Sequence, residues 1–308
     1  MLRTARSLIA ILLLSIAVLW LSATYSASAQ TPQKPASPES EQPKPVDVVK
    51  LTAGAEAGDV DSITQLARMY WSGQGVREDV KTAVDWYEKA AELGSLEAQM
   101  ILGAANFGGV KIPQNYALAG KYLLLAANQK NNLAEFYVGY MYQHGTGLEK
   151  SPEKAVHYME SSIADGSSVA QYELGVWYST GSGVIVDRVR ACNLFELGAK
   201  QGDPRAANSL GRCYAAGDGR EKDPLKAMAA FTQAAAAGNT DAEGSAAILC
   251  GETGDWEQSY MWLRIAVDAG VTQDGPALGR IKLKLTPAQI QSAETRASDW
   301  ERQHPMKK

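Results

Sequence analysis

The chain has few of the residues that usually build reaction centres. Its 308 residues include only three histidines and three cysteines. His144, His157 and His304 fall in a predicted loop, on a predicted helix and in the C-terminal tail, with no cysteine at ligand spacing. Metal ligation and general-base catalysis need converging partners. We therefore expect no metal ion and no other cofactor.

Catalytic and phosphate-binding motifs are also missing. The sequence contains neither G-x-S-x-G nor H-E-x-x-H, and its G-x-G loops lack the G-K-[ST] ending of a nucleotide-binding loop. The formal net charge of −4 gives no basic excess, so the composition does not indicate nucleic-acid binding. We expect a protein that is not an enzyme.

No apolar run reaches the roughly 20 residues of a typical membrane span. Arg3 and Arg6 precede an apolar run over 8–21, which is followed by the small residues Ala27-Ser28-Ala29. This order is typical of a secretory signal peptide over 1–29, and it predicts a periplasmic or secreted protein. The alternative is an uncleaved anchor, and only then do we expect contact with a membrane.

Residues 30–46 resemble a spacer. They contain five prolines among polar residues: Pro32, Pro35, Pro38, Pro43 and Pro45. Such a composition cannot bury enough apolar surface to fold, so we predict a disordered linker.

After residue 46 the sequence repeats with a period of 36. Three glycines and their counterparts 36 residues later show it: Gly181, Gly183 and Gly202, then Gly217, Gly219 and Gly238. A second series lies where helix ends are expected: Gly58, Gly94, Lys130, Gly166, Gly202 and Gly238. Each member is followed by Asp, Ser or Asn, which are the preferred N-caps. The pattern predicts a first helix, A, starting near residues 60, 96, 132, 168, 204 and 240.

A third series predicts the second helix, B, of each repeat. It consists of good N-caps 20 residues after the first caps: Asp79, Asn115, Ser151, Asp187 and Asp223. Each repeat is thus two helices of about 13 residues joined by a glycine-bearing loop. Apolar residues at helical spacing give each pair more apolar surface than it can cover alone, so neighbouring repeats are expected to stack.

Both ends of the array depart from the repeat. Residues 47–57 are predicted to form a lone helix B, and 271–285 a degenerate seventh helix A. Thr286-Pro287-Ala288-Gln289 is a capping box that predicts a closing helix over 286–303, followed by a tail over 304–308. We assign 47–285 to the repeat array.

The repeat resembles the Sel1-like repeat, a relative of the tetratricopeptide repeat. The matching residues in one unit are Ala170, Leu174-Gly175, Tyr178, Gly181-x-Gly183-Val184, Asp187, Ala191 and Gly198-Ala199. The second unit departs from the pattern, with Asn106 for the tyrosine and Lys111 for the second glycine. The resemblance implies an all-α, right-handed superhelical solenoid of about six helix pairs. It also implies a non-catalytic adaptor for other proteins, and exported members resemble regulators of envelope signalling or exopolysaccharide systems.

The three cysteines, Cys192, Cys213 and Cys250, are an odd number for an exported chain. Their positions in packed stretches favour buried free thiols, and a Cys213–Cys250 bridge between successive A helices is the alternative. The cysteine-rich branch of the family, some members of which act on β-lactams, pairs two cysteines within each repeat, a pattern that this chain lacks. A cell-wall or β-lactam hydrolase is therefore our second hypothesis, and a glycan-binding scaffold our third.

The candidate binding site is the side of helix A that faces away from helix B. Positions 64, 65, 68 and 71 and their counterparts share that side, and repeat 5 offers Asn208, Ser209 and Arg212 there. The predicted partner-binding residues are Arg68, Trp71, Phe107, Tyr137, Tyr140 and Tyr172. A helical solenoid would present this side as a concave groove for a protein or peptide. The alternative for each residue is packing against the previous repeat. Trp71 and Tyr140 are the residues we expect to be exposed anchors.

Overall fold

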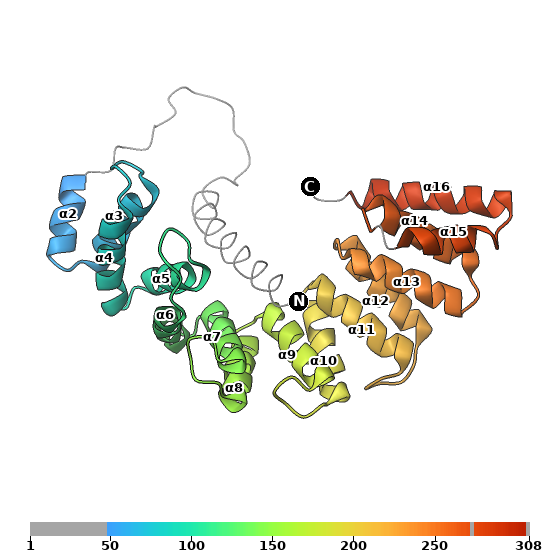
Figure 1. Ribbon diagram of the computed structural model, residues 1–308, viewed down its shortest axis with the longest axis horizontal. Helices are drawn as coiled ribbons and strands as arrows, with labels where there is room; N and C mark the ends of the chain where they lie inside the picture. The colour runs from blue at the N-terminus through green and yellow to red at the C-terminus, as the bar shows by residue number, and fades with distance from the viewer. Residues whose placement is uncertain (1–47, 272–273, 306–308) are drawn as a thin grey trace, which may run out of the picture. The chain divides into compact units, whose positions relative to one another are not determined.

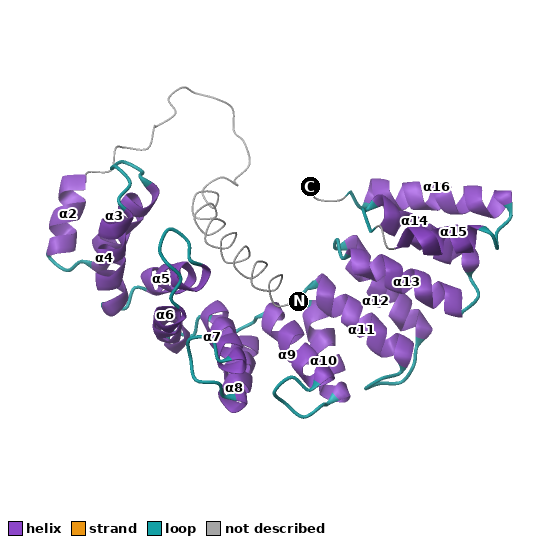
Figure 2. Cartoon of the chain, in the orientation of Figure 1, coloured by secondary structure: helices purple, strands orange, loops and turns teal. Residues whose placement is uncertain are grey.

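The computed structural model describes residues 48–271 and 274–305, and every regular element in these ranges is an α-helix (Figures 1 and 2). The predicted signal peptide and linker lie outside the described residues. None of the described helices is long and apolar enough to cross a membrane. The prediction of an all-α fold built from 36-residue helix pairs is confirmed.

The A helices have 13 residues each and begin at the predicted positions. They are α3 (Val60–Ser72), α5 (Leu96–Gly108), α7 (Asn132–His144), α9 (Ser168–Thr180), α11 (Pro204–Ala216) and α13 (Thr240–Glu252). The residue before each helix accepts a hydrogen bond from a backbone N–H of the first turn, as Asp59 does from Ser62. The predicted caps therefore set these starts.

The B helices also have 13 residues each. They are α4 (Val80–Glu92), α6 (Tyr116–Asn128), α8 (Pro152–Ala164), α10 (Arg188–Lys200), α12 (Pro224–Ala236) and α14 (Trp256–Asp268). The predicted N-caps of the first five all accept a backbone N–H, and Asp255 does the same for α14. The backbone is left-handed at every member of the series that follows helix B, with φ from 63° at Lys130 to 94° at Gly166. Glycine adopts this conformation without steric cost, whereas Lys130 does not.

The chain forms two compact units, residues 1–165 and 166–308. Unit 1 contains α2 (Val48–Glu56) to α8, and unit 2 contains α9 to α16 (Pro287–Gln303). Within each unit, every A helix packs against its own B helix, and B helices pack against the next A helix.

Small residues on the A helices allow this close packing. In unit 1 a Cβ at Gly103 would lie 2.8 Å from the Leu123 side chain, and in unit 2 a Cβ at Gly211 would lie 2.5 Å from the Phe231 ring. Glycine after the buried leucine of helix A (Leu102 and Leu210) therefore lets helix B approach closely.

The C-terminal end differs from the prediction in one element. The expected helix over 271–285 is reduced to α15 (Gly275–Lys282), eight residues with no buried side chain and no side-chain cap at Asp274. A helix with so few packing and capping interactions stays short, because nucleation is costly. The capping box at Thr286 and Gln289 is present and begins α16, which packs against α14.

Candidate partner-binding face

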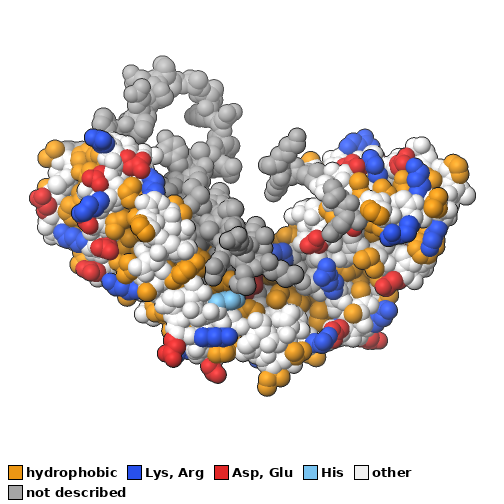
Figure 3. Space-filling model, viewed as in Figure 1, with side chains coloured by type: hydrophobic (Ala, Val, Ile, Leu, Met, Phe, Trp, Pro, Cys, Tyr) orange, Lys and Arg blue, Asp and Glu red, His pale blue; other side chains and the backbone are white. Residues whose placement is uncertain are grey.

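Between the third and the twelfth residue of the A helices, one series of equivalent residues is nowhere buried. We call it the open column, and it consists of Arg68, Ala104, Tyr140, Val176, Arg212 and Ile248. Its members are half-buried or exposed, whereas the neighbouring series contain buried residues such as Phe136 and Phe107. Exposed hydrophobic side chains lie among charged ones elsewhere in both units (Figure 3), so exposure alone does not single out a site. Within each unit, the open column follows one face through successive repeats.

Arg68 is held by the next repeat. Its guanidinium donates to Glu97 through Nε and Nη2, at 2.9 Å and 2.7 Å to Oε1, and Nη2 lies 2.5 Å from Oε2. The two side chains keep 39% and 37% of their surface exposed. The Glu97 carboxylate thus accepts hydrogen bonds from two nitrogens of the Arg68 guanidinium, and this ion pair links α3 to α5.

Trp71 is half-buried rather than freely exposed. Its ring meets Tyr87 edge to face, with centroids 6.0 Å apart, and Lys111 Nζ lies 5.5 Å from the Trp71 ring centroid. Lys111 also donates to the Trp71 carbonyl at 2.5 Å and to Glu78 at 2.9 Å. The backbone at Lys111 is left-handed, with φ 60°, where the corresponding residues of other repeats are glycine. This departure from the repeat pattern therefore joins repeats 1 and 2.

Two predicted binding residues belong to the core. Phe107 is 7% exposed and Tyr137 only 1% exposed. Their rings contact each other at 6.0 Å between centroids, and Phe107 also contacts Tyr116 at 5.4 Å. Burial raises the pKa of Tyr137. These two side chains fill the space between repeats 2 and 3, so neither offers surface to a partner in this structure.

Tyr140 remains half-buried, and its ring stacks on that of His144 with centroids 4.0 Å apart. His144 is exposed and lies one turn further along α7. The stacked rings lie at the C-terminal end of the helix. Of the predicted residues in unit 1, Tyr140 best fits the anchor role.

Tyr172 is half-buried beneath an arginine from the next repeat. The Arg205 guanidinium lies 4.4 Å from the Tyr172 ring centroid and pairs with Asp203 at 2.8 Å and with Glu173 at 3.7 Å. Burial is the main cause that raises the pKa of both Tyr172 and Glu173. The cluster joins α9 to α11, and nothing in the sequence pattern indicated it.

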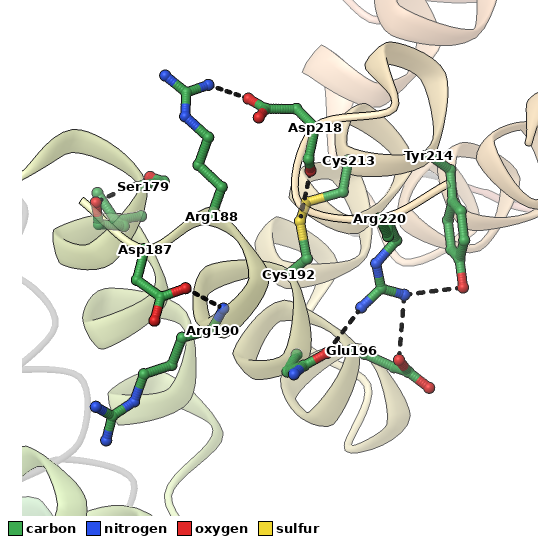
Figure 4. The surroundings of a disulfide bond; sticks show 12 residues. Ser179, Asp187, Arg188, Arg190, Cys192, Glu196, Cys213, Tyr214, Asp218 and Arg220 are labelled. Carbon is green, nitrogen blue, oxygen red and sulfur yellow. Dashed lines mark hydrogen bonds and ion pairs between the residues drawn. A yellow bond between two sulfur atoms is a disulfide. The ribbon is translucent and has the colours of Figure 1, made fainter. Parts of the chain in front are cut away.

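The cysteines pair differently from either expectation. Cys192 on α10 and Cys213 on α11 form a disulfide, with Cα atoms 6.1 Å apart, while Cys250 is a buried free thiol (Figure 4). The prediction of free thiols at Cys192 and Cys213 is wrong, and so is the alternative Cys213–Cys250 bridge. The physical reason is that helix B of one repeat packs directly on helix A of the next, which brings these two residues within bridging distance.

Further side chains cross the same boundary near the disulfide. Arg188 pairs with Asp218, and Arg220 donates to Glu196 at 3.2 Å across this boundary (Figure 4). Within repeat 5, Arg220 also donates to the Tyr214 hydroxyl at 2.8 Å, which orients its guanidinium. The disulfide and these contacts hold repeats 4 and 5 together.

The geometry offers surfaces for binding. Among residues 48–271 and 274–305, no three His, Cys, Asp or Glu side chains are grouped as metal ligands would be. His144 and His157 are exposed, and His304 stacks on Trp300 with centroids 3.9 Å apart.

Two solved structures share this architecture. A Sel1 repeat protein from Oxalobacter formigenes is 30% identical with a TM-score of 0.58, and the match covers 72% of this chain and 100% of that one. The Escherichia coli antigen c5321, described as having an SLR fold, is 25% identical with a TM-score of 0.51, over 83% of this chain and 64% of that one.

Two curated eukaryotic proteins match shorter stretches. The chitin synthase regulator SKT5 of Saccharomyces cerevisiae is 32% identical over 114 residues, which are 36% of this chain and 16% of that protein. HRD3A of Arabidopsis thaliana, a component of an ERAD-associated E3 ubiquitin-protein ligase, is 31% identical over 78 residues, 25% of this chain and 11% of that protein. The chain therefore spans less than a fifth of the length of either relative.

The model of the Sel1 repeat matches five consecutive units, residues 60–95, 96–131, 132–167, 168–203 and 204–239. Each matched unit contains one A helix and one B helix, from the pair α3–α4 to the pair α11–α12. Each unit ends at the residue that caps the next A helix. Since the matched units make up more than half of its length, the chain belongs to the Sel1-repeat family.

Proposed function

We propose that this protein is an exported, non-catalytic adaptor of the bacterial cell envelope that binds a partner protein through its A helices. In this role it regulates envelope signalling or exopolysaccharide production. The open column carries the proposal, because it keeps one face of successive A helices accessible while the rest of the repeat motif is used in caps, turns and core packing.

The names of the relatives support an adaptor role. One curated relative is a regulator of an enzyme, and the other is a component of a ligase assembly. Both descriptions are of proteins that act through other proteins, and helical repeat arrays present extended surfaces suited to that task.

The disulfide supports export. Structural disulfides persist in oxidising compartments such as the periplasm and are rare in the cytosol. The Cys192–Cys213 bridge therefore agrees with the signal peptide predicted over 1–29. It joins two successive repeats, unlike the bridges within single repeats of the cysteine-rich, β-lactam-acting branch.

The test is affinity capture from the envelope fraction, with the full-length chain carrying a C-terminal tag. We expect one partner protein to be enriched, and Tyr140→Ala to reduce its recovery without lowering the melting temperature. Recovery of the tagged chain from the cytosol alone would contradict export. Turnover of nitrocefin by the purified chain would contradict the non-catalytic role.

A further inference from the structure

In unit 2 the open column places a charged residue between two aliphatic ones. Val176 lies on α9, Arg212 on α11 and Ile248 on α13. Helix α11 contacts both of the other helices and lies between them in Figure 1. Ile248 is 66% exposed, Arg212 is exposed and Val176 is half-buried. The three side chains therefore form a row across three adjacent helices.

Arg212 is an open counterpart of Arg68. The two residues occupy the same position in repeats 5 and 1, and the position of Glu97, which binds Arg68, is taken by Asp241 in repeat 6. Aspartate is one methylene shorter, and Arg212 makes no ion pair with Asp241 or any other residue in the described ranges. Arg68 is thus neutralised by a carboxylate of the neighbouring repeat, whereas the guanidinium of Arg212 is available to a partner.

The neighbouring cation is already compensated. Arg205, two turns before Arg212, is paired with Asp203 and Glu173. Arg212 therefore supplies the uncompensated positive charge of this face, and its complement is a carboxylate.

Asn208 lies one turn before Arg212, on the same side of α11. It is only 7% exposed, its Oδ1 has no hydrogen-bond partner, and its amide donates to no residue in the described ranges. Buried polar groups without partners are rare in native proteins. Because Oδ1 has almost no accessible surface, the Nδ2 donors are the part of this amide that can reach a partner, and they match the C=O of an extended backbone.

The spacing of the helices fixes the form of the complement. Val176, Arg212 and Ile248 lie on three successive A helices that are in contact, and a segment in polyproline II conformation returns every third residue to the same side, with an advance of about 9 Å. We propose that unit 2 binds an extended partner segment with an acidic residue flanked by apolar residues three positions away on each side. The acid pairs with Arg212, the apolar residues contact Val176 and Ile248, and Asn208 holds the backbone. This inference rests on the proposed adaptor function and names the chemistry of its partner.

The test uses fluorescein-labelled peptides LPPEPPL and LPPKPPL and the full-length chain, purified as the cell processes it, with fluorescence anisotropy as readout. We expect the acidic peptide to bind about tenfold more tightly than the lysine peptide, and Arg212→Ala to remove the difference. Arg212→Glu should reverse the preference, which a structural role of Arg212 would not do. Arg280→Ala, at an exposed arginine of α15 outside the open column, is the matched control and should leave both affinities unchanged.

Asn208→Ala separates backbone binding from charge. We expect weaker binding of both peptides with a melting temperature that is unchanged or higher, because the variant removes a buried group without a partner. A preference that survives Arg212→Glu, or binding of neither peptide by the wild-type chain, would overturn the proposal. So would self-association that Arg212→Glu abolishes, since it would identify a second copy as the occupant. Partner capture that Arg212→Glu leaves intact would overturn this inference but leave the adaptor function standing.

Discussion

Replacing Glu243 by glutamine should make the C-terminal end of unit 2 less sensitive to pH near neutrality. Glu243 lies on α13, is 6% exposed, and its Oε2 has no hydrogen-bond partner in the described ranges. Burial, followed by the charges of Asp274 and Glu301, raises the pKa of Glu243 from 4.5 to about 7. The folded chain thus binds this proton more tightly than the unfolded chain does.

The sign and size of the effect follow from linkage. The protonated form favours folding fully below the unfolded pKa of 4.5, and this contribution is lost as pH rises through about 7. A difference of about 2.5 pKa units corresponds to about 3 kcal/mol. About 1 kcal/mol of it is already lost at pH 5, so about 2 kcal/mol remains to be lost between pH 5 and pH 8. Glutamine has no charge to desolvate, so the advantage of Glu243→Gln over wild type should grow by about 2 kcal/mol between pH 5 and pH 8.

Hydrogen exchange of peptides from α13 and α16, corrected for the intrinsic rate at each pH, measures the local opening free energy. Comparison with the wild-type chain cancels other carboxyl groups whose pKa is raised, such as Glu173. Glu252→Gln is the control, because Glu252 is exposed on the same helix. If the variant and the wild-type chain lose opening free energy equally between pH 5 and pH 8, the argument from burial is refuted.

Two further predictions concern the stacking of repeats. Reducing the disulfide, or replacing Cys192 or Cys213 by serine, should lower the free energy of unfolding of unit 2 by about 3 kcal/mol, because the bridge closes a loop of 21 residues. Chemical denaturation with and without reductant measures this loss. An unchanged midpoint would contradict the pairing. Gly211→Ala should cost about 1–3 kcal/mol, because its Cβ would lie 2.5 Å from the Phe231 ring. Gly279→Ala is the matched helical control with open space around it, and it should stabilise α15 slightly; equal melting temperatures for the two variants would rule out the packing argument.

The sequence by itself determined the helices and their order. Asp59 caps α3 and Asp79 caps α4 through backbone groups three residues away. The glycine that follows helix B adopts a left-handed backbone conformation, which also depends only on neighbouring residues. Such signals act within one turn, so a reader of the sequence can place both ends of each helix. The period of 36 then specifies that the pairs stack.

Only the tertiary structure decided which side chains of the A-helix face are available. Phe107 and Tyr137 lie on the same side of the A helices as accessible residues, but the packing of repeat 2 on repeat 3 buries both. The Cys192–Cys213 bridge, the Lys111–Trp71 contact and the open state of Arg212 depend on residues about 20 to 40 positions apart. Their distances are set by how closely one repeat packs on the next, and the volume of the intervening side chains fixes that packing. Periodicity specifies which residues share a face, whereas packing determines which of them can meet a partner.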